Sequence, residues 1–243
     1  MLARITPVLL LIAILVLAAC GGDAEEDEIP QDPQALLRDA ATLIQEAETF
    51  RLEVIPSGAP FVFLIDLGDG SAEVQFNRAI GQYAAPDEIQ ATINVTTGVP
   101  IDIEIYADGA EQWFRAPLIG WVNEDFAPLF DPARLLAEGG GFEVALAALR
   151  NLEYIGRETI NGIATHHLSG SAEGAGVTDL LVGLIEIEGD VPIDVFLDRA
   201  TGYPVRLVIE QPGTAIETAP NTTWQVDVFD VNAPDEIARP EGA

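Results

Sequence analysis

Several segments of this chain alternate apolar and polar residues, and that alternation constrains the fold more than any other feature. Segment 88–95 is EIQATINV and segment 100–108 is PIDIEIYAD, and IDVFLD, PVRLVIE and TWQVDVFDV repeat the pattern towards the end of the chain. A period of two puts the apolar side chains on one face of a β-strand and the polar ones on the other. The pattern therefore predicts an antiparallel sheet of about nine strands with one solvated face.

One long segment has a helical period instead. Residues 33–50, PQALLRDAATLIQEAETF, carry apolar residues at spacings of three and four. This predicts an amphipathic helix with Asp32 as its N-cap and Pro33 in its first turn. Shorter helices are predicted at three further places, 131–136, 142–149 and 177–184. The expected fold is one α+β domain over residues 34–232, followed by a flexible tail at 233–243.

The N-terminal residues predict export and a lipid anchor. A continuous aliphatic run, residues 8–17, follows Arg4 and ends in small residues and Cys20, the one cysteine of the chain. The run is well short of the ~20 residues that a membrane span needs, so it predicts a secretory signal peptide over residues 1–19. The motif LAAC at 17–20 resembles the bacterial lipobox. This resemblance implies a diacylglyceryl group on Cys20, cleavage just before it, and anchorage on the outer face of the cell membrane.

Charge restricts the partners of the chain. Forty acidic residues face eleven basic ones, which gives a formal charge of −29. Such a surface argues against nucleic acid, which requires clustered cations, and against an electrostatic grip on anionic lipid. Residues 20–33 contain an acidic cluster, glycines and prolines, and are expected to form an extended, disordered tether with a reach of at most about 40 Å. A single cysteine allows no intrachain disulfide, so the core alone must hold the fold.

The residues THHLSG contain the one cluster of catalytic residue types, His166, His167 and Ser169. Adjacent residues in a strand point to opposite faces, so the two histidines are not expected to act together on one metal or one nucleophile. A structural role is the favoured interpretation. A hydrolase that uses His166 or His167 is the alternative.

Acidic residues also surround a glycine-containing turn at 68–70. They are Asp66, Asp69 and Glu73. Glycines occupy positions that an EF-hand loop fills with oxygen ligands, so a hairpin turn is favoured over a calcium site. No metal and no cofactor are expected.

The predicted sheet has more apolar surface than the predicted helices can cover. About nine aliphatic stripes would lie on one side of the sheet, against one long helix and two or three short ones. If the sheet is strongly curved, the remaining concave surface forms a cavity suited to an aliphatic ligand. Flat packing without a cavity is the alternative. The alternation nominates cavity-wall residues, namely Ile93, Val95, Ile103, Ile105, Val195, Leu197, Leu207, Val226 and Val228. Trp113 and Trp121 are nominated for the cavity mouth, and ordinary core packing is the alternative for every one of these residues.

The order of several segments resembles the LppX/LprG family of bacterial lipoproteins, which is similar in fold to LolA and LolB. The segments are GQYAAPDEIQATINV, IEIYADGAEQWFRAPLIGW, FDPARLLAE, YIGRETINGIATHHLSG and DRATGYPVRL. The resemblance implies a strongly curved antiparallel half-barrel closed by helices around a hydrophobic cavity. It also implies a non-enzymatic lipoprotein that carries acyl lipids or glycolipids within the cell envelope. The residues matching the family's motifs are Cys20, Gly156, Glu158, Asn161, Gly162, Asp198, Thr201, Gly202 and Pro204.

A second interpretation of the same resemblance is a non-enzymatic envelope sensor or regulatory module. Such a module would bind a transporter or another envelope protein rather than carry lipid.

Overall fold

A computed structural model describes residues 32–66, 71–123, 135–136, 141–147, 149–181, 187–213, 220–234 and 236–242. All described helices and strands lie within one compact unit, Asp32–Ala243. The predicted signal peptide, Cys20 and nearly all of the predicted tether lie outside the described residues.

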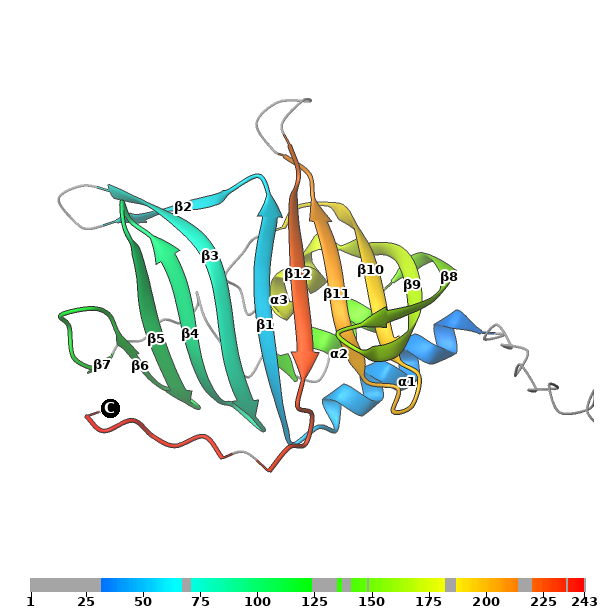
Figure 1. Ribbon diagram of the computed structural model, residues 1–243, viewed down its shortest axis with the longest axis horizontal. Helices are drawn as coiled ribbons and strands as arrows, with labels where there is room; N and C mark the ends of the chain where they lie inside the picture. The colour runs from blue at the N-terminus through cyan, green and yellow to red at the C-terminus, as the bar shows by residue number, and fades with distance from the viewer. Residues whose placement is uncertain are drawn as a thin grey trace, which may run out of the picture. The chain divides into compact units, whose positions relative to one another are not determined.

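The compact unit is built on one antiparallel sheet of twelve strands, in the order β7-β6-β5-β4-β3-β1-β12-β11-β10-β9-β8, with β2 paired to β3 (Figure 1). The strands are β1 (Thr49–Gly58), β2 (Phe61–Asp66), β3 (Ser71–Ala84), β4 (Glu88–Thr96), β5 (Pro100–Asp108), β6 (Glu111–Arg115), β7 (Val122–Asn123), β8 (Arg150–Ile160), β9 (Ile163–Glu173), β10 (Asp190–Asp198), β11 (Pro204–Gln211) and β12 (Thr222–Phe229). The described helices are α1 (Pro33–Gln45), α2 (Gly141–Ala147) and α3 (Gly174–Leu180). The predicted α+β class with a single curved antiparallel sheet is confirmed.

The predicted start of the first helix is also confirmed. The Asp32 carboxylate accepts hydrogen bonds from the backbone N–H groups of Gln34 (3.0 Å) and Ala35 (3.1 Å), and Pro33 lies in the first turn. A carboxylate at this position satisfies N–H groups that have no partner within the helix. The buried stripe of α1 consists of Leu37, Ala40, Ala41 and Ile44.

The end of the first helix differs from the prediction. α1 ends at Gln45 rather than at Phe50, and Phe50 belongs to β1, opposite Tyr83 of β3. The two rings stack with their centroids 4.9 Å apart, and Phe142 of α2 meets Phe50 edge-on at 5.8 Å. The helical spacing therefore continues past the true end of the helix, because sheet pairing and aromatic burial outweigh a local preference that is worth only tenths of a kcal/mol per residue.

Within the described residues the sheet has twelve strands, where about nine were predicted. The alternating segments 88–95 and 100–108 correspond to β4 and β5, whose residues pair from Glu88 with Asp108 to Thr96 with Pro100. In β3 and β8 the register shifts at bulges, which disturb the period of two. Alternation therefore reveals β4 and β5 clearly, whereas the bulges interrupt it in β3 and β8.

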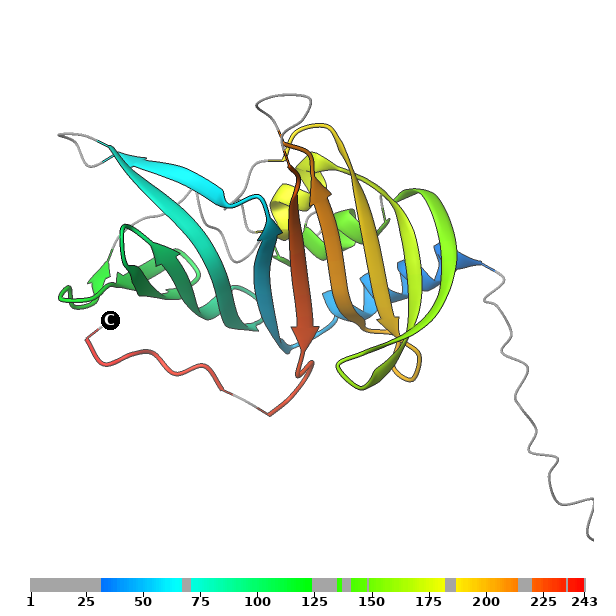
Figure 2. The same cartoon turned by 45° about the horizontal axis from the view of Figure 1, so that its top comes forward.

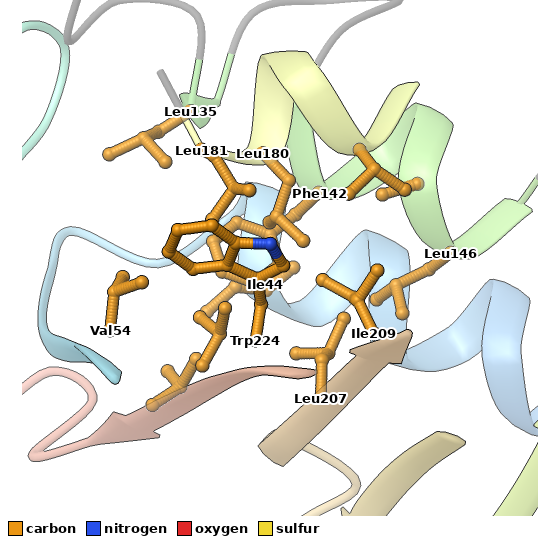
Figure 3. Packing of buried hydrophobic residues seen from close by; sticks show 14 of the residues in the cluster. Ile44, Val54, Leu135, Phe142, Leu146, Leu180, Leu181, Leu207, Ile209 and Trp224 are labelled. Atoms are coloured by element: carbon orange, nitrogen blue, oxygen red, sulfur yellow. The ribbon is translucent and has the colours of Figure 1, made fainter. Parts of the chain in front are cut away.

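The three described helices lie on one side of the sheet, against the half that runs from β1 and β12 to β8 (Figures 1 and 2). We define the sheet face toward the helices as the inner face and the opposite face as the outer face. Between the helices and this half of the sheet, the Trp224 indole lies among aliphatic side chains of both layers (Figure 3). The core therefore includes Ile44 of α1, Phe142 of α2, Leu180 of α3 and Leu207 of β11.

The shorter helices differ from their predicted bounds. α2 covers Gly141–Ala147 where 142–149 was predicted, and α3 begins three residues before the predicted segment 177–184. Of the predicted helix 131–136, only residues 135 and 136 are described, and Leu135 belongs to the buried core. Among the described helices, none combines the length and the apolar character that crossing a bilayer requires.

Candidate functional site

The predicted wall residues of β4 and β5 lie together on the inner face. Ile93 is opposite Ile103 in the register of these strands, and Val95 and Ile105 occupy inner-face positions on the same two strands. Ile93, Val95 and Ile105 are buried, and Ile103 is partly buried against the core cluster. The next residues along each strand, such as Asn94 and Asp102, face outward. This half of the sheet therefore has an aliphatic inner surface and a polar outer one.

The remaining aliphatic wall residues lie on the inner face of the other half. Val195 of β10 is opposite Leu207 of β11, which is opposite Val226 of β12. Leu197 and Val228 continue the same inner-face rows, and all five side chains belong to the buried core cluster. This is the half of the sheet against which α1, α2 and α3 lie (Figure 1).

The two halves of the inner face thus have different surroundings among the described residues. The apolar rows run without interruption from β10 through β12 and β1 to β5, whereas the described helices lie only against the half from β1 to β8 (Figures 1 and 2). The inner face of β3, β4 and β5 continues the apolar surface beyond these helices.

The ring contacts described for the two tryptophans nominated for the cavity mouth are with tyrosine and arginine side chains. Trp113 is opposite Tyr106 in the register, which places it on the outer face, while its neighbour Phe114 is opposite Ile105 on the inner face. The Arg239 guanidinium lies 4.3 Å from the centre of the Trp113 ring. The Arg115 guanidinium lies 5.2 Å from the ring of Trp121, which is partly exposed. The sequence EQWFR offers two large aromatic residues in succession, and alternation alone does not decide which one faces inward.

The two histidines point to opposite faces, as predicted. His166 lies on the inner face, with its Nδ1 atom 3.1 Å from the hydroxyl group of Tyr154. His167 lies on the outer face, where Nδ1 is 2.8 Å from Glu158 and Nε2 is 3.1 Å from Asp194. The two rings therefore do not meet at one site, and each already has polar partners. This arrangement favours the structural interpretation of both.

The environment of His166 predicts that the stability of the folded protein depends measurably on pH. Burial lowers the pKa of His166 from its usual 6.5, and the positive charges of Arg199 and Arg157 lower it further. The unfolded chain then binds the proton more readily than the folded one. The contribution of His166 to stability is expected to be complete above pH 6.5 and to be lost progressively as the pH falls below it.

Nuclear magnetic resonance titration of His166, together with denaturation between pH 5 and pH 7.5, would check this dependence. His166→Gln serves as the control and should lack this part of the pH dependence. A pKa of His166 at or above 6.5 in the folded protein would contradict the prediction.

The acidic turn at 68–70, for which a hairpin was favoured over a calcium site, lies mostly outside the described part of the chain. Glu73 is exposed on β3, whereas Asp69 and the side chain of Asp66 lie outside the described part of the chain. Within the described ranges, no group of three or more histidine, cysteine, aspartate or glutamate residues is arranged to hold a metal ion.

Cys20 lies outside the described residues, and the other residues that match the family motifs lie in the β8–β9 and β10–β11 hairpins. Asn161 and Gly162 form the turn between β8 and β9 with positive φ angles of 51° and 86°. In the turn after β10, Asp198 accepts hydrogen bonds from the backbone N–H of Ala200 (2.8 Å) and the hydroxyl group of Thr201 (2.7 Å). These contacts stabilise turns, which is consistent with a structural role.

β2 is one of the strands that the sequence pattern did not predict. β2 begins with FVFLI, a run without polar residues, and it pairs with only the first part of β3. Phe61 of β2 lies against Trp224, with ring centroids 5.1 Å apart, and Trp224 also meets Phe76 of β3 at 5.8 Å. A strand with one solvated face is expected to alternate, so the search for alternation passes over β2. The unbroken apolar run FVFLI is the sequence signal by which β2 could have been found.

Comparison with known proteins identifies the family. No curated protein is significantly similar to the chain in sequence. Among solved structures, LprF from Mycobacterium bovis is similar, with a TM-score of 0.61 and 18% identity over 85% of this chain and 96% of that one. The lipoprotein LppX from Mycobacterium tuberculosis is also similar, with a TM-score of 0.56 and 19% identity over 85% of this chain and 100% of that one. At these identities the likeness establishes a common fold. A sequence model described as LppX_LprAFG lipoprotein matches residues 32–234, so the chain belongs to the LppX_LprAFG lipoprotein family.

Proposed function

We propose that this protein is a membrane-anchored lipoprotein that binds acyl lipids or glycolipids and carries them within the cell envelope. The supporting observation is the extent of the apolar inner face. It continues across β3, β4 and β5, beyond the half of the sheet against which the described helices lie. A surface of this kind suits an acyl chain, because each methylene group removed from water contributes about 0.8 kcal/mol.

The proposed binding surface consists of Ile93, Val95, Ile103 and Ile105 on β4 and β5. A chain of a dozen methylene groups would gain roughly 10 kcal/mol from complete burial there, before the cost of ordering the ligand is subtracted. The outer face of the same strands carries polar side chains, so a hydrocarbon would gain little on that side. Holding and releasing a lipid requires no catalytic group, and we propose no enzymatic activity.

The proposed location at the membrane depends on the N-terminal motif. A lipidated Cys20 would hold the compact unit at the outer face of the cell membrane, with residues 21–31 as the connection to Asp32. More than one acyl chain on a single residue gives lasting anchorage. The net charge of −29 would discourage a second, electrostatic attachment to anionic lipid.

Lipid extraction and native mass spectrometry of residues 21–243, purified from a bacterial host, would test the proposal. This segment contains the whole compact unit and omits the signal peptide and the anchor. The expected result is a co-purified acyl lipid or glycolipid at up to one molecule per protein. A protein that never carries lipid, and that takes none from phosphatidylcholine vesicles, would contradict the function. Stable capture of one envelope protein by such a lipid-free chain would instead favour the regulatory module.

A further inference from the structure

β2 exposes apolar side chains on the outer face of the sheet, where their partners in β3 are polar. Val62 and Leu64 point outward and are 48% and 68% exposed. Their partners in β3 at the same face are Gln75 and Glu73, which are the polar residues expected there. Exposed apolar side chains in neighbouring positions of one strand carry a cost in water, and such departures from patterning occur mainly at functional sites.

The sheet also divides at this strand. β3 pairs with β1 only from Ala79 to Ala84, and its earlier residues, 71–76, pair with β2 instead. Beyond Val54, the residues of β1 pair with β12 alone. Figures 1 and 2 show the result, in which β3 diverges from β1 and β2 runs across between their separated ends. We refer to the region between 55–58 of β1 and 71–76 of β3 as the split.

Side chains, rather than backbone hydrogen bonds, close the inner side of the split. Phe61 and Phe76 converge on Trp224, with ring centroids 5.1 and 5.8 Å from it, and Val54 is buried beside them. Phe63, one inner-face position further along β2, is 36% exposed, whereas Trp224 is fully buried. Apolar side chains thus form a continuous path from the exposed part of β2 into the core.

The narrow end of the split is held by charge on the outer face. Val54 and Ala79 form the last pair between β1 and β3, and the guanidinium of Arg78 is hydrogen bonded to the Glu53 carboxylate beside them. This ion pair joins the two strands where their backbone pairing ends. At the opposite, wide end, residues 59–60 lead from β1 into β2, which pairs with β3, and among the described residues no ion pair is recorded there. Side-chain rotation at the wide end would cost far less than breaking a strand ladder.

We propose that the split is the entrance by which an acyl chain passes from the outer face to the inner face. The acyl chain of the lipid would first lie along Val62 and Leu64, then pass Phe61 and reach the inner face of β3. The polar headgroup of the lipid would remain outside. This proposal rests on the proposed function and adds the route by which the lipid reaches the binding surface. The neighbouring pair β4 and β5, by contrast, is joined along its whole length.

The double variant V62T/L64T tests the entrance directly. Both side chains are largely exposed, so the fold should be retained, and its thermal unfolding temperature would verify this. The matched control is I155T/I163T, which removes two isoleucines that are 51% and 37% exposed at the β8–β9 end of the sheet. The measurement is stopped-flow uptake of pyrene-labelled phosphatidylcholine from phosphatidylcholine vesicles by residues 21–243.

We expect V62T/L64T to load about tenfold more slowly than the unmodified chain, which corresponds to about 1.4 kcal/mol in the barrier, with the same final occupancy. I155T/I163T should load at the unmodified rate. Phe61→Leu, which narrows the side chain at the inner end of the path, should accelerate loading and release by the same factor.

The results of this uptake experiment distinguish failure of the proposed entrance from failure of the proposed function. If the unmodified chain takes up the lipid and both double variants load equally fast, the entrance lies elsewhere and lipid binding stands. If V62T/L64T lowers the final occupancy without slowing uptake, β2 belongs to the resting site, which also overturns the entrance. If the unmodified chain takes up no lipid, the proposed function fails, and the entrance fails with it.

Discussion

Replacing Trp224 by alanine should lower the free energy of unfolding by about 3–5 kcal/mol, the range for loss of a large buried aromatic side chain. The indole is fully buried and contacts Phe61 and Phe76, and it is surrounded by aliphatic side chains of the sheet and the helices (Figure 3). Its Nε1–H donates a hydrogen bond to the side chain of Gln211 at 2.9 Å. The substitution would therefore leave both a cavity and an amide without its donor. Urea denaturation of residues 21–243 measures the change.

Trp121→Ala is the matched control, because this indole is partly exposed and its described contact is with an arginine. It should cost less than about 1.5 kcal/mol. A loss of under 1 kcal/mol for Trp224→Ala would mean that the surrounding side chains collapse into the space, which would contradict a rigidly packed junction between the helices and the sheet.

The regular part of the fold could be predicted from short-range pattern. In β4 and β5 each residue pairs without a bulge, so the period of two survives in the sequence and identifies both strands and their inner faces. Asp32 was identified as the helix cap because capping depends on residues only two and three positions away. These interactions are local, and a local pattern is sufficient to reveal them.

The errors occur where distant residues decide the outcome. Phe50 fits the helical spacing of α1, yet its partner is Tyr83, more than thirty residues later, and that pairing places it in β1. Trp113 and Phe114 are both large and aromatic, and the register with β5 rather than their own identity assigns one to each face. β2 lacks alternation altogether, so the criterion that identified the other strands passed over it.

The nominated wall residues show the same limit of prediction from a local sequence pattern. Alternation placed Ile103 and Val195 in one group, and both do lie on the inner face. It could not separate them, because the position of the helices against one half of the sheet depends on contacts between segments far apart in the chain. Val195 belongs to β10, in the half against which the helices pack, whereas Ile103 belongs to β5, which lies beyond that half (Figure 1). This difference divides the nominated residues into two groups with different expected effects.

Ile103→Asn should weaken lipid binding about tenfold while costing only about 1–2 kcal/mol in stability. The side chain is partly buried on β5, and an amide there would face a bound acyl chain without a hydrogen-bond partner. Such a penalty of about 1.4 kcal/mol corresponds to a tenfold change in Kd. Val195→Asn, fully buried in the other half, should do the reverse and cost about 3 kcal/mol or more in stability. Equilibrium titration with pyrene-labelled phosphatidylcholine measures the affinity, and urea denaturation measures the stability.

The matched control is Ile80→Asn, which makes the same change at a partly buried residue of β3 on the outer face of the same half. It should leave lipid affinity unchanged. The comparison is decisive because a folded domain stable by about 5 kcal/mol remains roughly 99% folded after a loss of 2 kcal/mol. A purely structural role for Ile103 would then leave lipid affinity almost unaltered. Equal affinities of Ile103→Asn, Ile80→Asn and the unmodified chain would therefore remove Ile103 from the binding surface, whatever the stability measurements show.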